Sequence, residues 1–114
     1  MKSSKIIPIR SKPARDLDSI EKLIHQIVTF RERRGWHLVH NPKDLAISIS
    51  LEANELLELF QWRRTAKSLD RVEEELADIL IYALTLAHDL GMDPGRAITR
   101  KLLKNGKKYP IKSS

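Results

Sequence analysis

Apolar residues recur every three to four positions through most of the chain, and this spacing predicts helices. The first stripe of this kind consists of Leu17, Ile20, Ile24, Ile27 and Val28. Asp18, followed by Glu21 three residues later, predicts the N-terminal cap of a helix, and Gly35 predicts its end. No segment alternates apolar and polar residues in the way that is typical of a β-strand.

Three further helices are predicted where a capping residue precedes the same periodicity. Asn41 and Asp93 are each followed by proline, which is favoured in the first helical turn because its missing N–H would have no partner there. Asp70 also precedes a glutamate three residues on, as in a capping box. The expected helices run from Asn41 to about Arg64, from Asp70 to Leu90, and from Asp93 to about Asn105 and Gly106. Four helices with short connections predict an all-α fold, a four-helix bundle.

Two pairs of acidic residues lie within the apolar sectors of the two central helices. Glu52 and Glu55, and then Glu75 and Asp78, are each three residues apart, so each pair lies on one helix face. At about 100° per residue, each pair points in nearly the same direction as several apolar residues of its own helix. These are Leu45, Ile49, Leu56 and Leu59 on the first helix, and Val72, Ile79, Tyr82 and Leu86 on the second.

Four carboxylates that face a bundle interior repel one another and lose hydration, so they must be protonated, paired or bound to metal. Few basic residues share their faces, and Arg63 and Arg71 are the nearest. Carboxylate oxygens are hard ligands that suit Mg²⁺ or Mn²⁺, and Mg²⁺ usually completes its coordination with waters and substrate phosphates. Such metals stabilise charge on a phosphate and lower the pKa of an attacking water. The acid pairs therefore predict metal-dependent chemistry at a phosphate.

Two other interpretations of the acid pairs are weaker. One pair at this spacing is usually an exposed pair on a solvated helix face, but two pairs on adjacent helices, both in the apolar sector, favour a metal site. A di-iron carboxylate bundle typically carries Glu-x-x-His on two helices. The sequence does not support that class, because no glutamate stands three residues before any of the four histidines, His25, His37, His40 and His88.

The net charge of +6 hides an acidic body between two basic ends. Residues 1–15 hold five Lys/Arg and residues 100–114 hold six, with no acid in either segment. The middle of the chain therefore holds ten of the 21 basic residues against all 15 acidic ones, a net charge of −5. This pattern differs from the continuous basic stripe of a typical nucleic-acid-binding domain. We expect a basic arm over 1–15, a helical domain over 16–110 and a short tail over 111–114.

Composition excludes several classes of site and location. The chain has no cysteine, which rules out disulfides and thiolate metal sites. Its longest apolar stretch, over 79–87, is far shorter than the roughly 20 residues that a membrane span needs. The first residues lack the apolar core of a signal peptide. A soluble cytoplasmic protein without membrane association is therefore expected.

Glu52-Ala-Asn-Glu55, followed after nineteen residues by Glu75-Leu-Ala-Asp78, resembles the acidic signature of the MazG-like, all-α nucleoside triphosphate pyrophosphohydrolases. Over 18–110 the chain resembles their small dCTP pyrophosphatase branch, notably in Phe30-Arg-Glu-Arg-Arg-Gly-Trp36, Glu58-Leu-Phe-Gln-Trp62 and Lys101-Leu-Leu-Lys-Asn105-Gly-Lys-Lys-Tyr109-Pro110. The resemblance implies Mg²⁺-dependent cleavage between the α and β phosphates, which gives a nucleoside monophosphate and pyrophosphate. It implies that the four acids bind metal and that one of the first two also orients the attacking water.

The resemblance further implies a substrate pocket and an oligomer, a homodimer or a dimer-built homotetramer with sites shared between subunits. The positions expected around the base and sugar are Trp36, Trp62 and Tyr82, and those expected to close over the phosphates and sugar are Lys101, Asn105 and Tyr109. Each also has an ordinary interpretation as a packing, charge or helix-ending residue. The residue before the first tryptophan is often acidic in relatives and is Gly35 here, which leaves the choice of base open.

The leading hypothesis is a (d)NTP pyrophosphohydrolase that prefers deoxynucleotides such as dCTP. A rival hypothesis is a non-catalytic helical module that binds nucleic acid or an acidic partner through the basic ends, with an affinity that falls steeply with salt. A third is a sensor that binds a metal–NTP complex without cutting it.

Overall fold

The computed structural model describes residues 19–66 and 68–112. Within these ranges the chain forms four α-helices and one 3₁₀ turn, without β-strands. The elements are α1 (Ile20–Arg33), η4 (Trp36–Leu38), α2 (Pro42–Glu58), α3 (Leu69–Asp89) and α4 (Pro94–Lys108). The predicted all-α fold is therefore confirmed, while the expected arm over 1–15 lies outside the described residues.

Capping residues fix the starts of α2 and α4 where the sequence predicts them. The side chains of Asn41 and Asp93 each accept a hydrogen bond from the backbone N–H three residues later, at 2.9 and 3.0 Å. A proline occupies the first turn in both helices. Gly35 adopts the left-handed conformation (φ 69°) just after α1, a conformation that ends a right-handed helix at little cost for glycine.

Serines cap the other two helices, which differs from the prediction. Ser19 and Ser68 accept hydrogen bonds from the N–H three residues on, and α1 and α3 begin directly after them. Asp18, the predicted cap of α1, lies outside the described residues. Asp70 lies inside the first turn of α3, where its negative charge still suits the helix N-terminus.

Two helix ends also differ from the expected ones. α2 stops at Glu58 rather than near Arg64, and the chain then turns through Trp62, which has a left-handed φ of 68°. A left-handed residue cannot continue a right-handed helix, so the turn excludes a longer α2. α4 continues through Gly106 to Lys108, because one exposed glycine costs a helix only about 1 kcal/mol.

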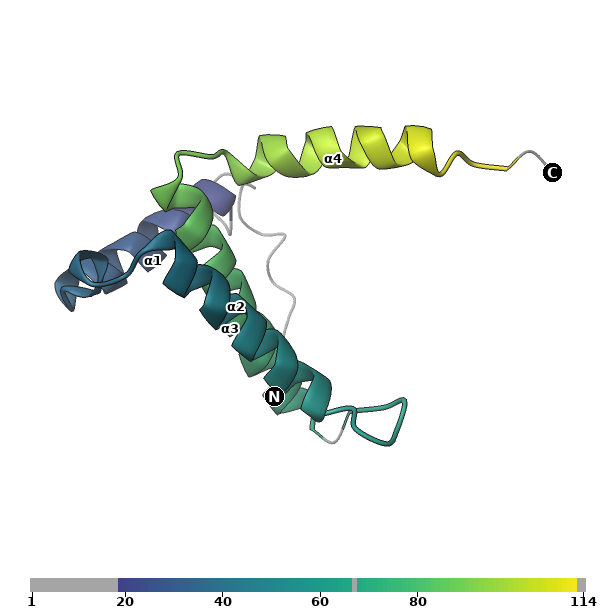
Figure 1. Cartoon of the computed structure of the whole chain (residues 1–114), viewed down its shortest axis with the longest axis horizontal. Coiled ribbons are helices and arrows are strands. Elements are labelled where there is room, and N and C mark those ends of the chain that lie inside the picture. Colours follow the sequence, from purple (N-terminus) through teal and green to yellow (C-terminus); the bar gives the residue numbers. More distant parts are fainter. Residues whose placement is uncertain (1–18, 67, 113–114) are drawn as a thin grey trace, which may run out of the picture.

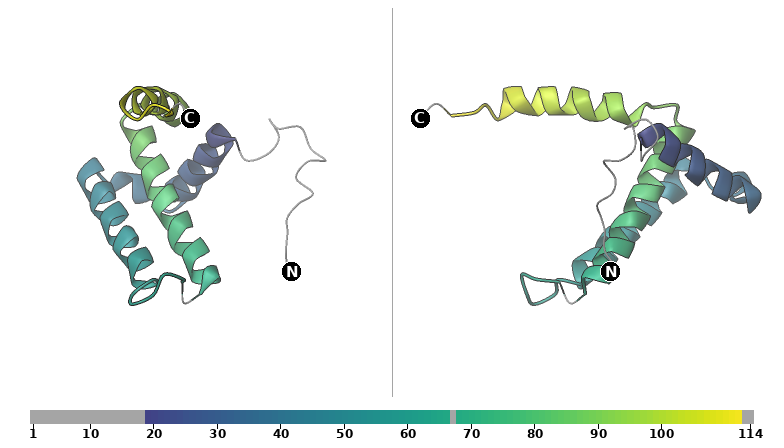
Figure 2. Two further views of the ribbon diagram at one scale, coloured as in Figure 1. Left: turned by 90° about the vertical axis from the view of Figure 1, so that its right-hand side faces the viewer. Right: turned by 180° about the vertical axis from the view of Figure 1, so that it is seen from behind.

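The two central helices lie side by side as an antiparallel hairpin, and α1 packs against α3 (Figures 1 and 2). Leu45 and Leu59, near the two ends of α2, are 1% and 3% exposed and form the apolar centre. A bidentate ion pair fastens α1 to the end of α3: Arg31 donates to both carboxylate oxygens of Asp89, at 2.8 and 2.7 Å. This pairing raises the pKa of Arg31 and lowers that of Asp89.

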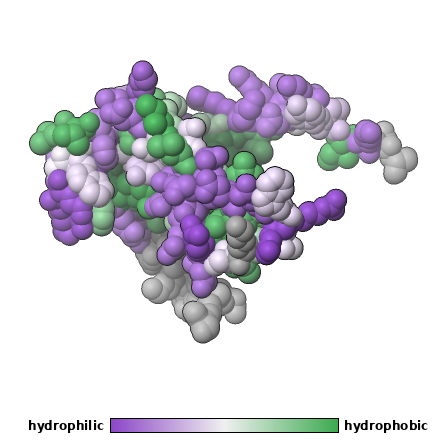
Figure 3. All heavy atoms as spheres, turned by 60° about the horizontal axis from the view of Figure 1, so that its bottom comes forward, coloured by the Kyte–Doolittle hydropathy of each residue, from purple (hydrophilic) through white to green (hydrophobic). Residues whose placement is uncertain are grey.

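The last helix leaves the end of α3 and projects away from the hairpin (Figure 1). Its apolar residues Ile98, Leu102 and Leu103 are exposed, as are Leu51 and Leu80 on the hairpin. Figure 3 shows apolar surface lying open among hydrophilic side chains. The radius of gyration of the Cα atoms is 17.1 Å, whereas about 13 Å is typical of a compact domain of this length. None of the described helices combines the length and apolar character that crossing a membrane requires.

Candidate metal centre and adjoining pocket

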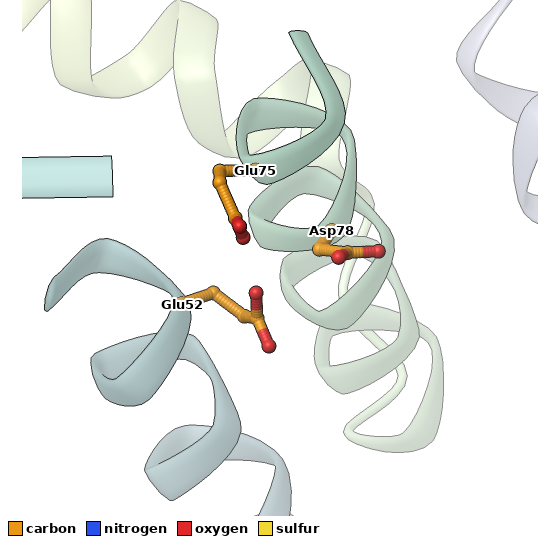
Figure 4. Close-up of side chains that lie close together, drawn as sticks. All are labelled: Glu52, Glu75 and Asp78. Carbon is orange, nitrogen blue, oxygen red and sulfur yellow. The ribbon is translucent and has the colours of Figure 1, made fainter. Parts of the chain in front are cut away.

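Three carboxylates converge between the two helices of the hairpin. Glu52 comes from α2, and Glu75 and Asp78 come from α3, one turn apart (Figure 4). One carboxylate oxygen of each lies within 4.8 Å of the others. An all-oxygen set of this kind, contributed by two rigid elements, matches the ligands that Mg²⁺ and Mn²⁺ prefer.

The apolar stripes place these acids at the helix interface. The predicted neighbours are half-buried or buried, and Glu52 and Glu75 are themselves half-buried, while Asp78 is exposed. Because side chains three and four residues apart share a helix face, packing the leucines of α2 against α3 brings the acids together as well. Glu52 and Glu75 therefore lie at the apolar interface as expected, and the exposed Asp78 lies beside them.

The cluster carries more negative charge than its surroundings balance. The pKa of Glu52 is raised from 4.5 to about 7, first by a hydrogen bond shared with Glu75, then by burial and by the charges of Glu55 and Asp78. Arg71 pairs with Glu75 at a long 3.9 Å, across one turn of α3. Arg63, the other basic residue expected nearby, forms no ion pair within the described ranges. A cation would relieve the repulsion that keeps a proton on Glu52.

Glu55, the fourth predicted ligand, does not belong to the three-residue cluster. Its side chain is exposed, one turn beyond Glu52 on α2. Its charge nevertheless contributes to the raised pKa of Glu52, which places it within electrostatic reach of the centre.

A pocket of about 480 Å³ opens beside the cluster, and Asp78 belongs to both. Trp36 and Tyr82 line it, so two residues predicted from the sequence come together with a predicted metal ligand. Phe30 supports Trp36 by an edge-to-face contact, with 5.8 Å between ring centroids. The remaining lining residues are Gln26, Ile27, Arg31, His40, Leu45, Ile81 and Thr85. The volume falls within the range of small-molecule sites, about 300–1,000 Å³.

Comparison with known families agrees with this geometry. The model of the MazG-like family matches residues 47–114, which include all four predicted metal ligands and more than half of the chain. The chain belongs to the MazG-like family.

Individual relatives of this MazG-like chain are named as pyrophosphatases. Rat dCTP pyrophosphatase 1 is 33% identical over 113 residues, covering 91% of this chain and 65% of the relative. The human protein of the same name is 31% identical over 107 residues, covering 86% of this chain and 61% of the human protein. A crystal structure of a pyrophosphatase from Archaeoglobus fulgidus is 46% identical, with a TM-score of 0.72, and the match covers 81% of this chain and 93% of that one. The MazG-like chain spans slightly less than two thirds of the mammalian relatives.

Four predicted substrate residues of the MazG-like chain do not reach this centre within one subunit. Trp62 is 93% exposed on the turn after α2. The other three, Lys101, Asn105 and Tyr109, lie along or just after α4, which extends away from the hairpin (Figure 1). The α3 ligands of the cluster, by contrast, lie on the first half of that helix, far along the chain from α4.

Sequence reasoning missed three polar residues in or near the pocket of the MazG-like chain: Arg31, Asp89 and His40. Arg31 is 6% exposed, lines the pocket and donates hydrogen bonds to Asp89. His40 also lines the pocket. A signal for Arg31 was available, because it extends the apolar stripe of Ile24 and Ile27 by one more turn. A basic residue in such a stripe implies a buried partner.

Proposed function

We propose that this chain hydrolyses nucleoside triphosphates between the α and β phosphates, giving a nucleoside monophosphate and pyrophosphate, with a preference for dCTP or other deoxynucleotides. The observation that carries the proposal is the cluster of Glu52, Glu75 and Asp78 beside a pocket with aromatic walls. The names of the rat and human relatives and of the archaeal structure support the same reaction.

Mg²⁺ is the proposed cofactor, with Mn²⁺ as a substitute. The three clustered carboxylates fit such an ion, and Glu55 is the proposed fourth ligand from the adjacent turn of α2. When bound, the ion would stabilise negative charge on the phosphates and lower the pKa of a water molecule. One of the two α2 glutamates, Glu52 or Glu55, orients that water by accepting a hydrogen bond from it.

The nucleoside occupies the adjoining pocket in this proposal. Trp36 and Tyr82 offer the flat apolar surfaces on which a base stacks. Asp78 belongs both to the pocket wall and to the carboxylate cluster. A base held between the aromatic residues therefore has its phosphates directed toward the carboxylates, which is the orientation that hydrolysis requires.

A homodimer, or a homotetramer built from dimers, completes the proposed site. The described part of the chain buries two apolar side chains below one tenth exposure and leaves apolar faces open on both the hairpin and α4. Exposed apolar surface on this scale is typical of association sites. In the assembly, α4 and the residue after it supply Lys101, Asn105 and Tyr109 to the centre of another subunit, where their ammonium, amide and phenol groups contact the phosphates and sugar. Trp62 reaches the base from its exposed turn in the same way.

The direct test is product analysis with each common dNTP and NTP, with and without Mg²⁺. We expect metal-dependent release of monophosphate and pyrophosphate, without diphosphate, and fastest turnover of dCTP. The variant Glu75→Gln should lose activity because it removes one ligand, whereas Glu74→Gln, an exposed neighbour on α3, should keep it. Diphosphate and orthophosphate as products would move the cut to the β–γ bond, and equal activity of both variants would refute the metal centre.

The rival function rests on the charge of the projecting helix. α4 carries six basic residues and no acid, which suits nucleic acid or an acidic partner. Salt-sensitive DNA binding without turnover of any nucleotide would favour it over the hydrolase. The sensor hypothesis predicts metal-dependent nucleotide binding without products. The cytoplasmic location expected from the sequence stays a prediction.

A further inference from the structure

A buried arginine forms part of the pocket wall. The guanidinium of Arg31 belongs to a side chain that is 7% exposed, and Asp89 occupies both of its terminal nitrogens. This bidentate pairing fixes the plane of the guanidinium and balances its charge. The group therefore presents a rigid donor to the pocket rather than a mobile cation.

One donor of that guanidinium has no partner among residues 19–66 and 68–112. The Nε–H of Arg31 and the Nδ1 of His40 are buried and make no hydrogen bond within the described residues, and both side chains line the same pocket. The other buried polar side chain there, Thr85, is satisfied, since its hydroxyl donates to the carbonyl of Ile81 at 2.7 Å. Buried polar atoms without partners are rare in native proteins, and a bound ligand removes the cost of leaving them unpaired.

We propose that Arg31 selects the base of the substrate, by donating its Nε–H to a carbonyl oxygen on the base edge. Arginine can only donate, so it requires an acceptor, and the flat walls provided by Trp36 and Tyr82 require a planar ligand. Cytosine, thymine, uracil and guanine carry an exocyclic carbonyl oxygen, whereas adenine carries an amino group instead. His40 lines the same pocket and, in this proposal, contacts the same base through Nδ1. Asp89 acts as a positioning residue that holds the guanidinium plane. The inference rests on the proposed function, because it assumes that the pocket holds the base.

The test compares Arg31→Lys with Arg33→Lys, an exposed position on the same helix. Lysine at position 31 keeps a positive charge for Asp89 and removes the planar Nε–H donor. We expect its kcat/KM for dCTP to fall about tenfold, as for loss of one hydrogen bond from a charged donor, with dATP changed less than about twofold. Arg33→Lys should leave both values unchanged. Equal losses for both nucleotides would indicate a structural role and overturn the inference.

A second measurement does not depend on hydrolysis. Titration calorimetry without metal compares the binding of dCMP with that of dAMP to the folded chain. Wild-type protein should bind dCMP more tightly, and Arg31→Lys should lose most of that difference. If the wild type binds both equally, the inference fails even where hydrolysis is observed. If the wild type hydrolyses nothing but selects dCMP through Arg31, the proposed function fails and the base-selection site stands.

Discussion

Glu52 holds its proton to a higher pH than an ordinary glutamate, and this property ties the metal centre to pH. Its pKa is raised from 4.5 to about 7 by the hydrogen bond with Glu75, by burial and by neighbouring negative charge. Because the native pKa exceeds the ordinary one, the stabilisation from the protonated form is fully present below pH 4.5 and is lost as pH rises through about 7. At higher pH, where the metal-free cluster is least stable, a bound cation takes the place of the proton.

Metal affinity should therefore depend on pH around neutrality. Mg²⁺ must displace the proton from Glu52, so the apparent affinity should fall as pH drops below about 7, approaching tenfold per pH unit. Calorimetric titration with Mg²⁺ at about pH 6 and about pH 8 measures this change, together with the protons released. The variant Glu52→Gln should bind Mg²⁺ weakly, and its affinity should not change with pH in this way. Equal wild-type affinities at the two pH values would contradict the displacement of a proton from Glu52 by the metal.

At this scale the sequence could predict residues that repeat a helical pattern, but not residues whose partners come from distant helices. Glu52, Glu75 and Asp78 share the phase of the leucines around them, which is visible in the sequence alone. The pairing of Arg31 with Asp89, 58 residues later, depends on how α1 crosses the end of α3. No local periodicity encodes that crossing.

Between elements, the ion pair of Arg31 and Asp89 joins α1 to the end of α3. Asp89→Ala should destabilise the chain by about 3–5 kcal/mol, because the buried guanidinium then loses its partner. Urea unfolding at fixed protomer concentration measures the loss. Since Arg31 lowers the pKa of Asp89, this contribution is present above the ordinary pKa of aspartate and is lost as pH falls through the native value.

A double variant provides the control for that prediction. Arg31→Met with Asp89→Leu replaces the pair by apolar side chains of similar reach, and it should recover most of the lost stability. A single Asp89→Ala variant as stable as the wild type would mean that the pair contributes little. Such a result would also weaken its proposed role in fixing the pocket wall.

The helices themselves could be predicted more closely than their ends. Asn41 and Asp93 could be predicted as caps because a proline, which favours the first helical turn, follows each of them. At the starts of α1 and α3, an aspartate lies one or two residues from the serine, and either side chain is able to cap. In the structure Ser19 and Ser68 are the caps, because each hydroxyl accepts a hydrogen bond from the backbone N–H three residues later. Two side chains that can both cap leave the exact start of a helix open by one or two residues in the sequence alone.

At the scale of the whole molecule, the periodicity of α4 predicts a helix with an apolar side. It does not indicate which surface packs against that side. In the structure that side is open: Ile98, Leu102 and Leu103 are exposed on a helix that leaves the hairpin (Figure 1). The same helix carries Lys101 and Asn105, which the family resemblance assigns to the phosphates and sugar. One second copy of the chain would both cover the apolar side and give these residues a site to act on.

Complementation between inactive variants tests this sharing. Glu75→Gln spoils the carboxylate cluster of its own subunit, and Asn105→Ala spoils the α4 contribution to the other subunit. In a mixed dimer, one site receives both defects and the other receives neither. Mixing equal amounts, after reversible dissociation, should restore about one quarter of wild-type activity, because half of the dimers are mixed and half of their sites are intact. The rate of monophosphate release measures the recovery.

The matched control mixes Glu75→Gln with Asp78→Asn. Both carboxylates come from α3 of one subunit, so every site in the mixed dimer lacks one ligand and no activity should return. Recovery in the first mixture but not in the second requires that the cluster and α4 of one site belong to different chains. Failure of both mixtures, although mixed dimers form, would mean that Asn105 acts on the cluster of its own chain. An Asn105→Ala variant that is active by itself would place Asn105 outside the site, and the exposed side of α4 would then serve association alone.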